Sequence, residues 1–164
     1  MKTTKVLQTN ISETNINEVS EVLNTSTGIR VAICNANTLV RSVRNHNIQN
    51  LINNFTIKTP DGFPVAKALS IMTKQKFVRV DGYKVFLQTI KDGLDKGKNH
   101  YFFGNNDATT SLMIDKLNAM FPEIKITGHL CPEVLDGDEL VDKYKTLFET
   151  IDTDIVWVSL GFPK

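Results

Sequence analysis

The sequence has little that would form a disulfide framework, a membrane span or a surface for binding polyanions. Its 164 residues include only two cysteines, and no stretch approaches the roughly 18 consecutive apolar residues of a transmembrane helix. The formal net charge of +1 gives no general attraction to nucleic acid. The N-terminal residues contain no long apolar run of the kind found in secretory signals. We therefore expect a cytoplasmic protein that does not bind nucleic acid.

Several common catalytic signatures are also missing. The sequence contains no G-x-x-x-x-G-K-[ST] loop, no H-E-x-x-H pair, no C-x-x-C pair and no G-x-S-x-G turn. Phosphate-loop nucleotidases, zinc hydrolases and serine esterases are therefore disfavoured. Cys34 and Cys131 are too few for a cysteine metal site, and Cys34 ends an apolar run, which is typical of a small core residue. We expect neither a metal nor a cofactor.

Short apolar runs that stop at a polar residue or glycine recur along the chain, and helical patterns follow them. Strands that are apolar throughout and alternate with helices are typical of a parallel sheet covered on both faces. We predict one α/β domain over residues 1–164, Rossmann-like, with a mainly parallel sheet of about five or six strands and helices on both faces. The runs are residues 31–34, 55–57, 101–103, 124–126 and 155–158.

The spacing of apolar residues also places the helices. It predicts one helical stretch that reaches Asn53 and a short strand near residues 5–8. Asp107 or Thr109 is expected to cap a further helix, and Asp138 to begin the last one. The remaining helices are predicted at about 15–24, 64–72 and 83–94.

Polar residues and glycines at the strand ends form the candidate site. In parallel sheets, ligands bind beyond the carboxyl ends of the strands. Residues that are distant in sequence should therefore line one crevice. They are Asn35, Asp61, Gly104, Gly128, His129 and Gly161.

Asp61 is the sharpest candidate for chemistry. A carboxylate in a Pro-Asp-Gly turn at a strand end is well placed to act as a general base. The same tripeptide is also ordinary turn chemistry, in which Asp makes an Asx-type hydrogen bond. The local sequence favours the turn alone, and the predicted position in the crevice brings the catalytic interpretation level with it.

Two asparagines and an arginine are candidates for binding. Asn35 and Asn37 could hydrogen-bond a ligand, although capping of the following helix is a sufficient account of Asn35. Arg79 could meet a phosphate, or it could be a surface arginine paired with a carboxylate.

A second set of candidates lies further along the chain. Gly104 and Asn105 start a strand-to-helix turn that resembles a phosphate-binding turn. The full G-x-G-x-x-G spacing is absent, so a plain loop is favoured. His129 could bind a donor phosphate, although a solvent-facing loop histidine is commoner.

Six stretches, taken in order, carry a resemblance to a known family: Val31–Asn37, Pro60–Gly62, Arg79–Gly82, Phe102–Gly104, Phe121–Gly128 and Leu160–Lys164. They are similar to the WecG/TagA/CpsF family of bacterial glycosyltransferases. The similarity is collinear and covers nearly the whole chain from about Lys5.

The resemblance implies an activity. It implies transfer of a sugar, often of the N-acetylmannosamine type, from a UDP-sugar to an undecaprenyl-diphosphate-linked acceptor in surface polysaccharide synthesis. It makes Asp61 the catalytic base, Asn35 a substrate contact and Arg79 a contact to the donor. Gly104, Gly128 and Gly161 would line the nucleotide pocket.

The resemblance also bears on metal use. Members of the family do not carry an Asp-x-Asp metal motif. Asp152-Thr153-Asp154 has that spelling, but it precedes a strand, so we do not assign it to the site.

The family continues past the position of Lys164 with a Gln-Glu pair and a membrane-docking appendage. The resemblance therefore implies a C-terminal truncation relative to the family, and membrane attachment through the missing elements at the inner face of the plasma membrane. Uncovered apolar surface would favour homo-oligomers. The alternative function is a nucleotide-sugar-binding or interaction module without turnover.

Overall fold

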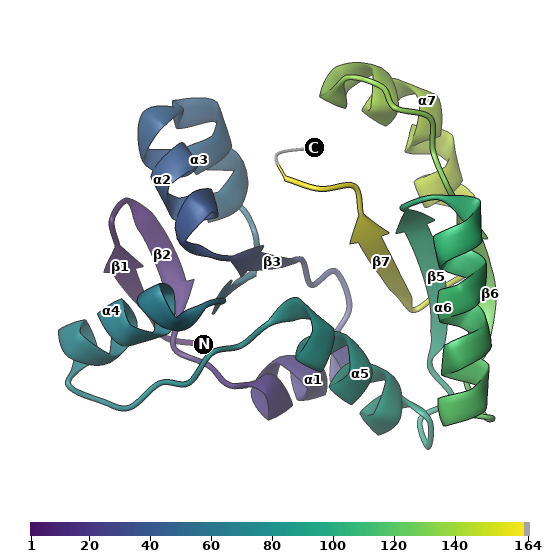
Figure 1. Cartoon of the computed structure of the whole chain (residues 1–164), viewed down its shortest axis with the longest axis horizontal. Coiled ribbons are helices and arrows are strands. Elements are labelled where there is room, and N and C mark those ends of the chain that lie inside the picture. Colours follow the sequence, from purple (N-terminus) through teal and green to yellow (C-terminus); the bar gives the residue numbers. More distant parts are fainter. Residues whose placement is uncertain (163–164) are drawn as a thin grey trace. The chain divides into compact units, whose positions relative to one another are not determined.

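The computed structural model describes residues 1–162, in which seven helices and seven strands form (Figure 1). The chain divides into two compact units, the first comprising residues 1–92 and the second beginning at Gly93. The predicted mixed α/β class is confirmed, and the organisation as a single domain stays a prediction.

The first unit begins with an antiparallel hairpin. Strand β1 (Thr3–Val6) pairs with β2 (Thr9–Ser12). Leu7 and Gln8 form the turn, and Leu7 has a φ of 54°, which is uncommon for a residue other than glycine. The short strand predicted near residues 5–8 is present as β1, shifted by two residues toward the N-terminus, and its hairpin partner β2 was not predicted. The turn has neither of the residues, Gly and Asn, that usually mark a two-residue hairpin loop.

The hairpin leads to a parallel pair of strands. Strand β3 (Val31–Cys34) pairs with β4 (Ile57–Pro60) in a register that sets Cys34 opposite Pro60. Strand β2 contacts β4, where the Ser12 hydroxyl accepts the Lys58 backbone N–H at 3.1 Å. Because Cys34 and Pro60 are the last residues of β3 and β4, the register places the carboxyl ends of both strands at the same edge of the pair.

Two apolar cores pack against this pair. The helices of this unit are α1 (Ile16–Thr25), α2 (Ala36–Arg44), α3 (His46–Asn53), α4 (Phe63–Thr73) and α5 (Gly82–Gly93). One core includes Cys34 with residues of the hairpin, α2, α3 and α4, and the other includes Ile57 with residues of α1 and α5. All five helices thus contribute to a core that includes a strand of the parallel pair.

The helical stretch predicted to reach Asn53 is two helices, α2 and α3. Asn45 lies between the two helices and is the N-cap of α3. Its side-chain oxygen accepts the backbone N–H groups of Asn47 and Ile48 at 2.9 and 3.2 Å. Apolar spacing continues across this break, and for that reason the pattern alone did not show it.

The second unit contains a three-stranded parallel sheet. Its strands are β5 (Asn99–Gly104), β6 (Lys125–Leu130) and β7 (Ile155–Ser159), in the order β6-β5-β7. Helix α7 (Gly137–Thr150) packs on β5 through Phe103, whose ring meets those of Tyr144 and Phe148 edge to face. Helix α6 (Asp107–Met120) connects β5 to β6.

The prediction of one sheet with five or six strands was wrong. The parallel strands lie in two small sheets, β3-β4 and β6-β5-β7. Alternation of apolar runs with helices indicates which segments are strands and that neighbours run parallel. It does not indicate which strands are neighbours, so the size of the sheet could not be inferred from it.

Candidate active site

Asp61 lies directly after β4, at the carboxyl end of the parallel pair. Its backbone N–H donates to the carbonyl oxygen of Cys34, the last residue of β3, at 3.0 Å. Its side chain is 16% exposed, so the carboxylate reaches solvent without being fully hydrated. The predicted position at a strand end is confirmed, and the catalytic role stays a prediction.

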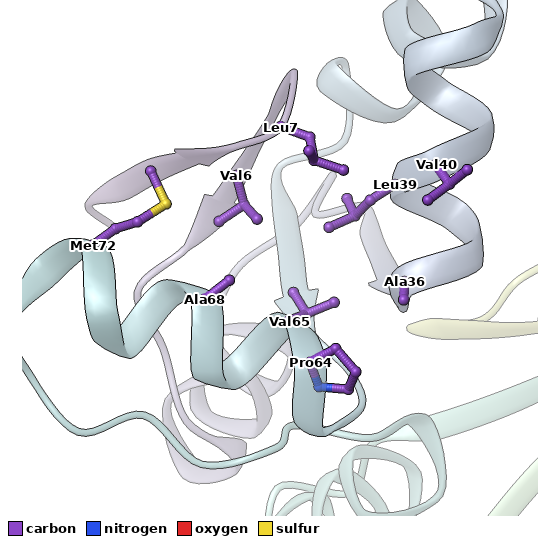
Figure 2. A pocket seen from close by; sticks show the side chains of 9 residues that line it. All are labelled: Val6, Leu7, Ala36, Leu39, Val40, Pro64, Val65, Ala68 and Met72. Carbon is purple, nitrogen blue, oxygen red and sulfur yellow. The ribbon is translucent and has the colours of Figure 1, made fainter.

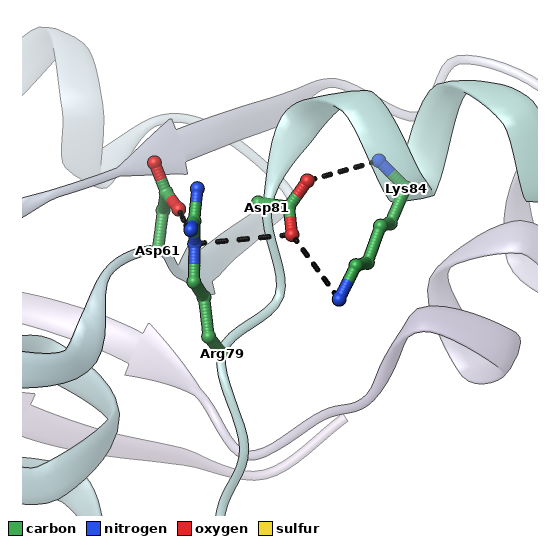
Figure 3. A network of polar contacts seen from close by, with 4 residues as sticks. All are labelled: Asp61, Arg79, Asp81 and Lys84. Carbon is green, nitrogen blue, oxygen red and sulfur yellow. Dashed lines mark hydrogen bonds and ion pairs between the residues drawn. The ribbon is translucent and has the colours of Figure 1, made fainter.

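The carboxylate of Asp61 belongs to a network of four charged side chains, drawn in Figure 3. Arg79 donates from Nε to Oδ1 of Asp61 at 2.9 Å and lies 3.8 Å from Oδ2 of Asp81. Lys84 Nζ lies 3.9 Å from the same Asp81 oxygen. The hydrogen bond that Arg79 donates to Asp61 raises the pKa of Arg79, so the guanidinium stays charged. Two carboxylates and two cations balance here.

The segment before α5 carries Arg79 to this position. The backbone N–H of Val80 donates to the carbonyl oxygen of Pro60 at 3.1 Å, and Val80 is fully buried. Further back, the N–H of Phe77 donates to the hydroxyl of Ser70 in α4 at 2.9 Å. The segment is therefore held against α4 at Phe77 and against the end of β4 at Val80, and the arginine is fixed by its backbone as well as by its ion pair.

Asp81 and Lys84 were not among the predicted site residues. Oδ1 of Asp81 accepts the backbone N–H of Lys84 at 3.0 Å, so the buried carboxylate caps α5 while its other oxygen faces Arg79. An Asp-Gly pair ahead of an amphipathic run is a helix N-terminus signal that could have identified Asp81.

Asn35 follows β3, next to Asp61 in the strand register. Its side-chain oxygen accepts the backbone N–H and the hydroxyl of Thr38, at 3.0 and 3.2 Å, and so caps α2. The capping interpretation is confirmed. A ligand contact by Asn35 would have to come from its amide nitrogen. Asn37 is exposed in the first turn of the same helix.

Cys34 is a core residue, as its sequence predicts. Its side chain is completely buried, and burial raises the pKa of the thiol to about 12. The thiol therefore stays protonated, and it does not serve as a nucleophile beside Asp61.

The second unit holds the remaining candidates. Gly104 ends β5, and a Cβ placed on it would lie 2.3 Å from the backbone oxygen of Ser159 in β7. Asn105 follows with a φ of 65° and donates its N–H to that same oxygen at 2.9 Å. The cap of α6 is Asn106, which accepts the N–H of Thr109 at 2.9 Å, so the predicted caps Asp107 and Thr109 were wrong.

Gly128 and His129 do not lie beyond a strand end. They lie within β6, where Gly128 pairs with Tyr101 and His129 with Phe102, so this part of the predicted crevice was wrong. A Cβ on Gly128 would lie 3.0 Å from the ring of Tyr101. The strand continues past the apolar run through Gly128, because the Tyr101 ring packs in the space that a side chain there would occupy.

Gly161 follows β7, with a φ of 78° that favours glycine. It is exposed. Pro163 and Lys164, which complete the last stretch of the family resemblance, lie outside the described residues.

Asp154 in the Asp-x-Asp spelling is occupied by structural bonds. One carboxylate oxygen accepts Lys98 Nζ at 2.9 Å and the other accepts the Asn99 backbone N–H at 3.0 Å. The segment precedes β7, as predicted. Within residues 1–162, no group of three or more His, Cys, Asp or Glu side chains is arranged to hold a metal ion.

None of the helices within the described residues 1–162 is both long and apolar enough to cross a membrane.

Comparisons with known proteins agree with one another. The sequence model for the family described as "Glycosyl transferase WecG/TagA/CpsF family" matches residues 4–164. The chain is also similar to an N-acetylglucosaminyldiphosphoundecaprenol N-acetyl-beta-D-mannosaminyltransferase from Bacillus spizizenii (strain ATCC 23059 / NRRL B-14472 / W23). It is 24% identical over 142 residues, which are 87% of this chain and 54% of that enzyme.

An enzyme of the same name from Bacillus subtilis (strain 168) is 23% identical over 136 residues, 83% of this chain and 52% of the relative. The chain thus spans about half the length of the curated relatives it matches.

Proposed function

Because the chain belongs to the WecG/TagA/CpsF family of glycosyl transferases, we propose that it transfers a sugar from a UDP-sugar to an undecaprenyl-diphosphate-linked acceptor. The sugar is of the N-acetylmannosamine type or a related hexose, and the product enters surface polysaccharide synthesis. The relatives' names support this choice, since they specify an N-acetyl-beta-D-mannosaminyl donor group and an N-acetylglucosaminyldiphosphoundecaprenol acceptor. The carrying observation is the Asp61–Arg79 pair at the end of β4.

Asp61 is the proposed general base. The acceptor hydroxyl must lose its proton as it attacks the anomeric carbon of the donor sugar, and a positioned carboxylate can accept it. Arg79 binds Oδ1, so we assign Oδ2 to the acceptor hydroxyl. The hydrogen bond from the guanidinium also fixes the direction of the carboxylate.

Arg79 is the proposed partner of the leaving group. The departing UDP gains negative charge on its diphosphate, which fixed donors can stabilise. A guanidinium has five N–H donors, and the bond to Asp61 uses the one on Nε. The terminal nitrogens can then meet the diphosphate, because the Arg79 side chain is 58% exposed. We propose that the transfer needs no metal.

Further substrate contacts are proposed from the polar groups and glycines near the strands. At the membrane, the reaction would take place on the cytoplasmic face, where a UDP-sugar and a polyprenyl lipid can meet, with the protein attached peripherally. In the first unit, the proposed contacts are Asn35 and Asn37. In the second unit, taken by itself, they are Gly104, Asn105 and Gly161.

A transfer assay tests the proposal. Radiolabelled UDP-N-acetylmannosamine is incubated with an N-acetylglucosaminyl-diphosphate polyprenol, with and without EDTA, and label in the lipid fraction is counted. We expect labelled lipid in both conditions. A folded protein that is stabilised thermally by UDP-sugars but labels no lipid would instead favour the module without turnover.

A further inference from the structure

The first unit contains an apolar groove outside the polar network. Nine side chains line a volume of about 310 Å³, and none of them is charged or carries a hydrogen-bonding group (Figure 2). They come from the hairpin turn, from α2 and from α4. A sugar nucleotide has no apolar segment that such a lining would recognise, so the groove fits a hydrocarbon ligand.

The groove runs along α4 and begins beside the proposed catalytic base. Pro64, Ala68 and Met72 line it at intervals of four residues, which places them along one side of two helical turns, about 12 Å in length. Figure 2 shows Pro64 and Ala36 at one end and Met72 at the other. Pro64 lies three residues after Asp61, and Ala36 directly follows Asn35, so this end adjoins the carboxyl ends of β4 and β3.

Small side chains inside and exposed apolar ones at the rim give the groove its form. Ala36 and Ala68 leave room where larger residues would fill it. Around them, Leu7 is 58% exposed, Met72 55% and Val40 41%. Leu7 occupies this place with a backbone φ of 54°, a conformation that costs free energy in a residue with a side chain. Apolar groups that remain exposed around a hollow are typical of a binding site.

We propose that this groove binds the isoprene units of the lipid-linked acceptor that lie nearest its diphosphate. The inference rests on the proposed function, which requires a polyprenyl acceptor with its sugar at Asp61. The volume is near the lower limit of the roughly 300–1,000 Å³ of small-molecule pockets, so it accommodates only a short part of the chain. The remainder would stay in the bilayer.

Charge at the catalytic end matches the same orientation. The N-cap of α4 is Gly62, which makes no side-chain cap bond, and the Asp61 carboxylate just before it is paired with Arg79. The exposed guanidinium of Arg79 is the neighbouring full charge. A diphosphate at this end and hydrocarbon toward Met72 therefore satisfy both parts of an amphipathic ligand.

Methyl NMR with farnesyl diphosphate as the probe tests the binding site directly. Inorganic diphosphate is the control for the head group, and a dilution series without probe is the control for self-association. We expect farnesyl diphosphate to shift the methyl signals of Leu7, Val40 and Met72, and inorganic diphosphate to leave them unchanged. Shifts that follow protein concentration and not the probe would mean that a second copy covers the groove, and would overturn the proposal.

Two matched pairs of variants complete the test. Val40→Gln and Met72→Gln place a polar group in the groove, whereas Val43→Gln and Ile71→Gln change similarly exposed side chains of the same helices outside it. We expect the first two to weaken farnesyl diphosphate binding at least tenfold and the other two less than twofold. Equal effects within each pair would overturn the assignment.

The transfer assay separates this inference from the proposed function. If no acceptor is labelled but the groove variants still weaken farnesyl diphosphate binding, the function fails and the groove assignment stands. If label is transferred equally well to acceptors with and without isoprene units, and Val40→Gln transfers as well as Val43→Gln, the function stands and the groove assignment fails.

Discussion

Arg79 Nε lies 2.9 Å from Asp61 Oδ1, although the two residues are 18 positions apart in the sequence. The contact depends on a backbone hydrogen bond between their neighbours, from Val80 N–H to the Pro60 carbonyl oxygen. This backbone hydrogen bond places the segment that carries Arg79 beside the segment that carries Asp61, and the side chains then complete the contact. Any substrate phosphate that binds Arg79 will also change the environment of the proposed base.

Asp61→Asn should abolish transfer and leave the fold intact. The amide has nearly the same shape and its oxygen can still accept the Arg79 bond, but it cannot take a proton from the acceptor hydroxyl. Loss of a general base reduces rates by roughly 10²–10⁴-fold. The measurement is the rate of lipid labelling, with UDP-induced thermal stabilisation as the check on folding and binding.

Asp152→Asn is the matched control, since it makes the same chemical change at an exposed position in the Asp-x-Asp spelling. We expect wild-type labelling from this variant. Full activity of Asp61→Asn would remove Asp61 from the mechanism, and loss of activity in Asp152→Asn would restore the acidic pair as a candidate.

Arg79→Met should reduce transfer by about 10²–10³-fold, the range found when one stabilising donor is removed from a reacting oxyanion. Lys84→Met removes the other cation of the network, which pairs with Asp81 and not with Asp61. It should retain most of the activity. Both side chains are exposed, so both variants should melt close to the wild-type temperature. Equal losses in the two variants would indicate a general charge effect instead.

Local structure could be predicted from the sequence where a single segment decides it. The helix after Asp61 was expected at residues 64–72 and observed at Phe63–Thr73, because Pro64 is acceptable in a first turn. The apolar run ending at Cys34 is a strand that the following asparagine ends by capping a helix. These features depend on residues within a few positions of one another.

Features that depend on distant segments could not be predicted. Nothing near Asp61 in the sequence specifies that Val80 will bond to Pro60, so the Asp61–Arg79 pair was known only as two separate candidates. The position of Gly128 inside β6 depends in the same way on the Tyr101 ring across the ladder. The apolar groove was missed because Ala36 and Ala68 become a hollow only when α2 and α4 face each other.

Gly104→Ala should destabilise the second unit by about 2 kcal/mol or more, the range of severe backbone and overpacking effects. The added Cβ would lie 2.3 Å from the backbone oxygen of Ser159, at a φ of 124° that side chains rarely adopt. A backbone atom in a sheet cannot move aside as a side chain could. Urea unfolding followed by circular dichroism measures the change.

Gly137→Ala is the control for Gly104→Ala. No heavy atom lies within 4 Å of its added Cβ, and the residue begins α7. Alanine should therefore stabilise the protein slightly, by about 0.5 kcal/mol. If the two variants had the same stability, the close approach of β5 and β7 at Gly104 would be incorrect.

The stability of the protein should fall as the pH drops from about 6.5 toward 4, and His100 should cause part of this fall. His100 is 1% exposed, and its Nδ1 accepts the indole N–H of Trp157 at 3.2 Å. Burial lowers its pKa from 6.5 to about 4. Between these pH values the unfolded chain binds a proton that the folded one excludes. The free energy of unfolding therefore falls by about 1.4 kcal/mol for each unit by which the pH decreases.

His100→Gln tests this assignment. The glutamine oxygen can still accept the indole N–H, but the side chain does not titrate. Wild-type protein should lose about 2 kcal/mol more stability than the variant between pH 6.5 and pH 5, measured by urea unfolding. Asp154 does not interfere, because its bonds to Lys98 and Asn99 lower its pKa below the usual value for Asp and out of this interval. If His100→Gln followed the wild-type pH dependence, the imidazole would have to be charged, or solvated, inside the folded sheet.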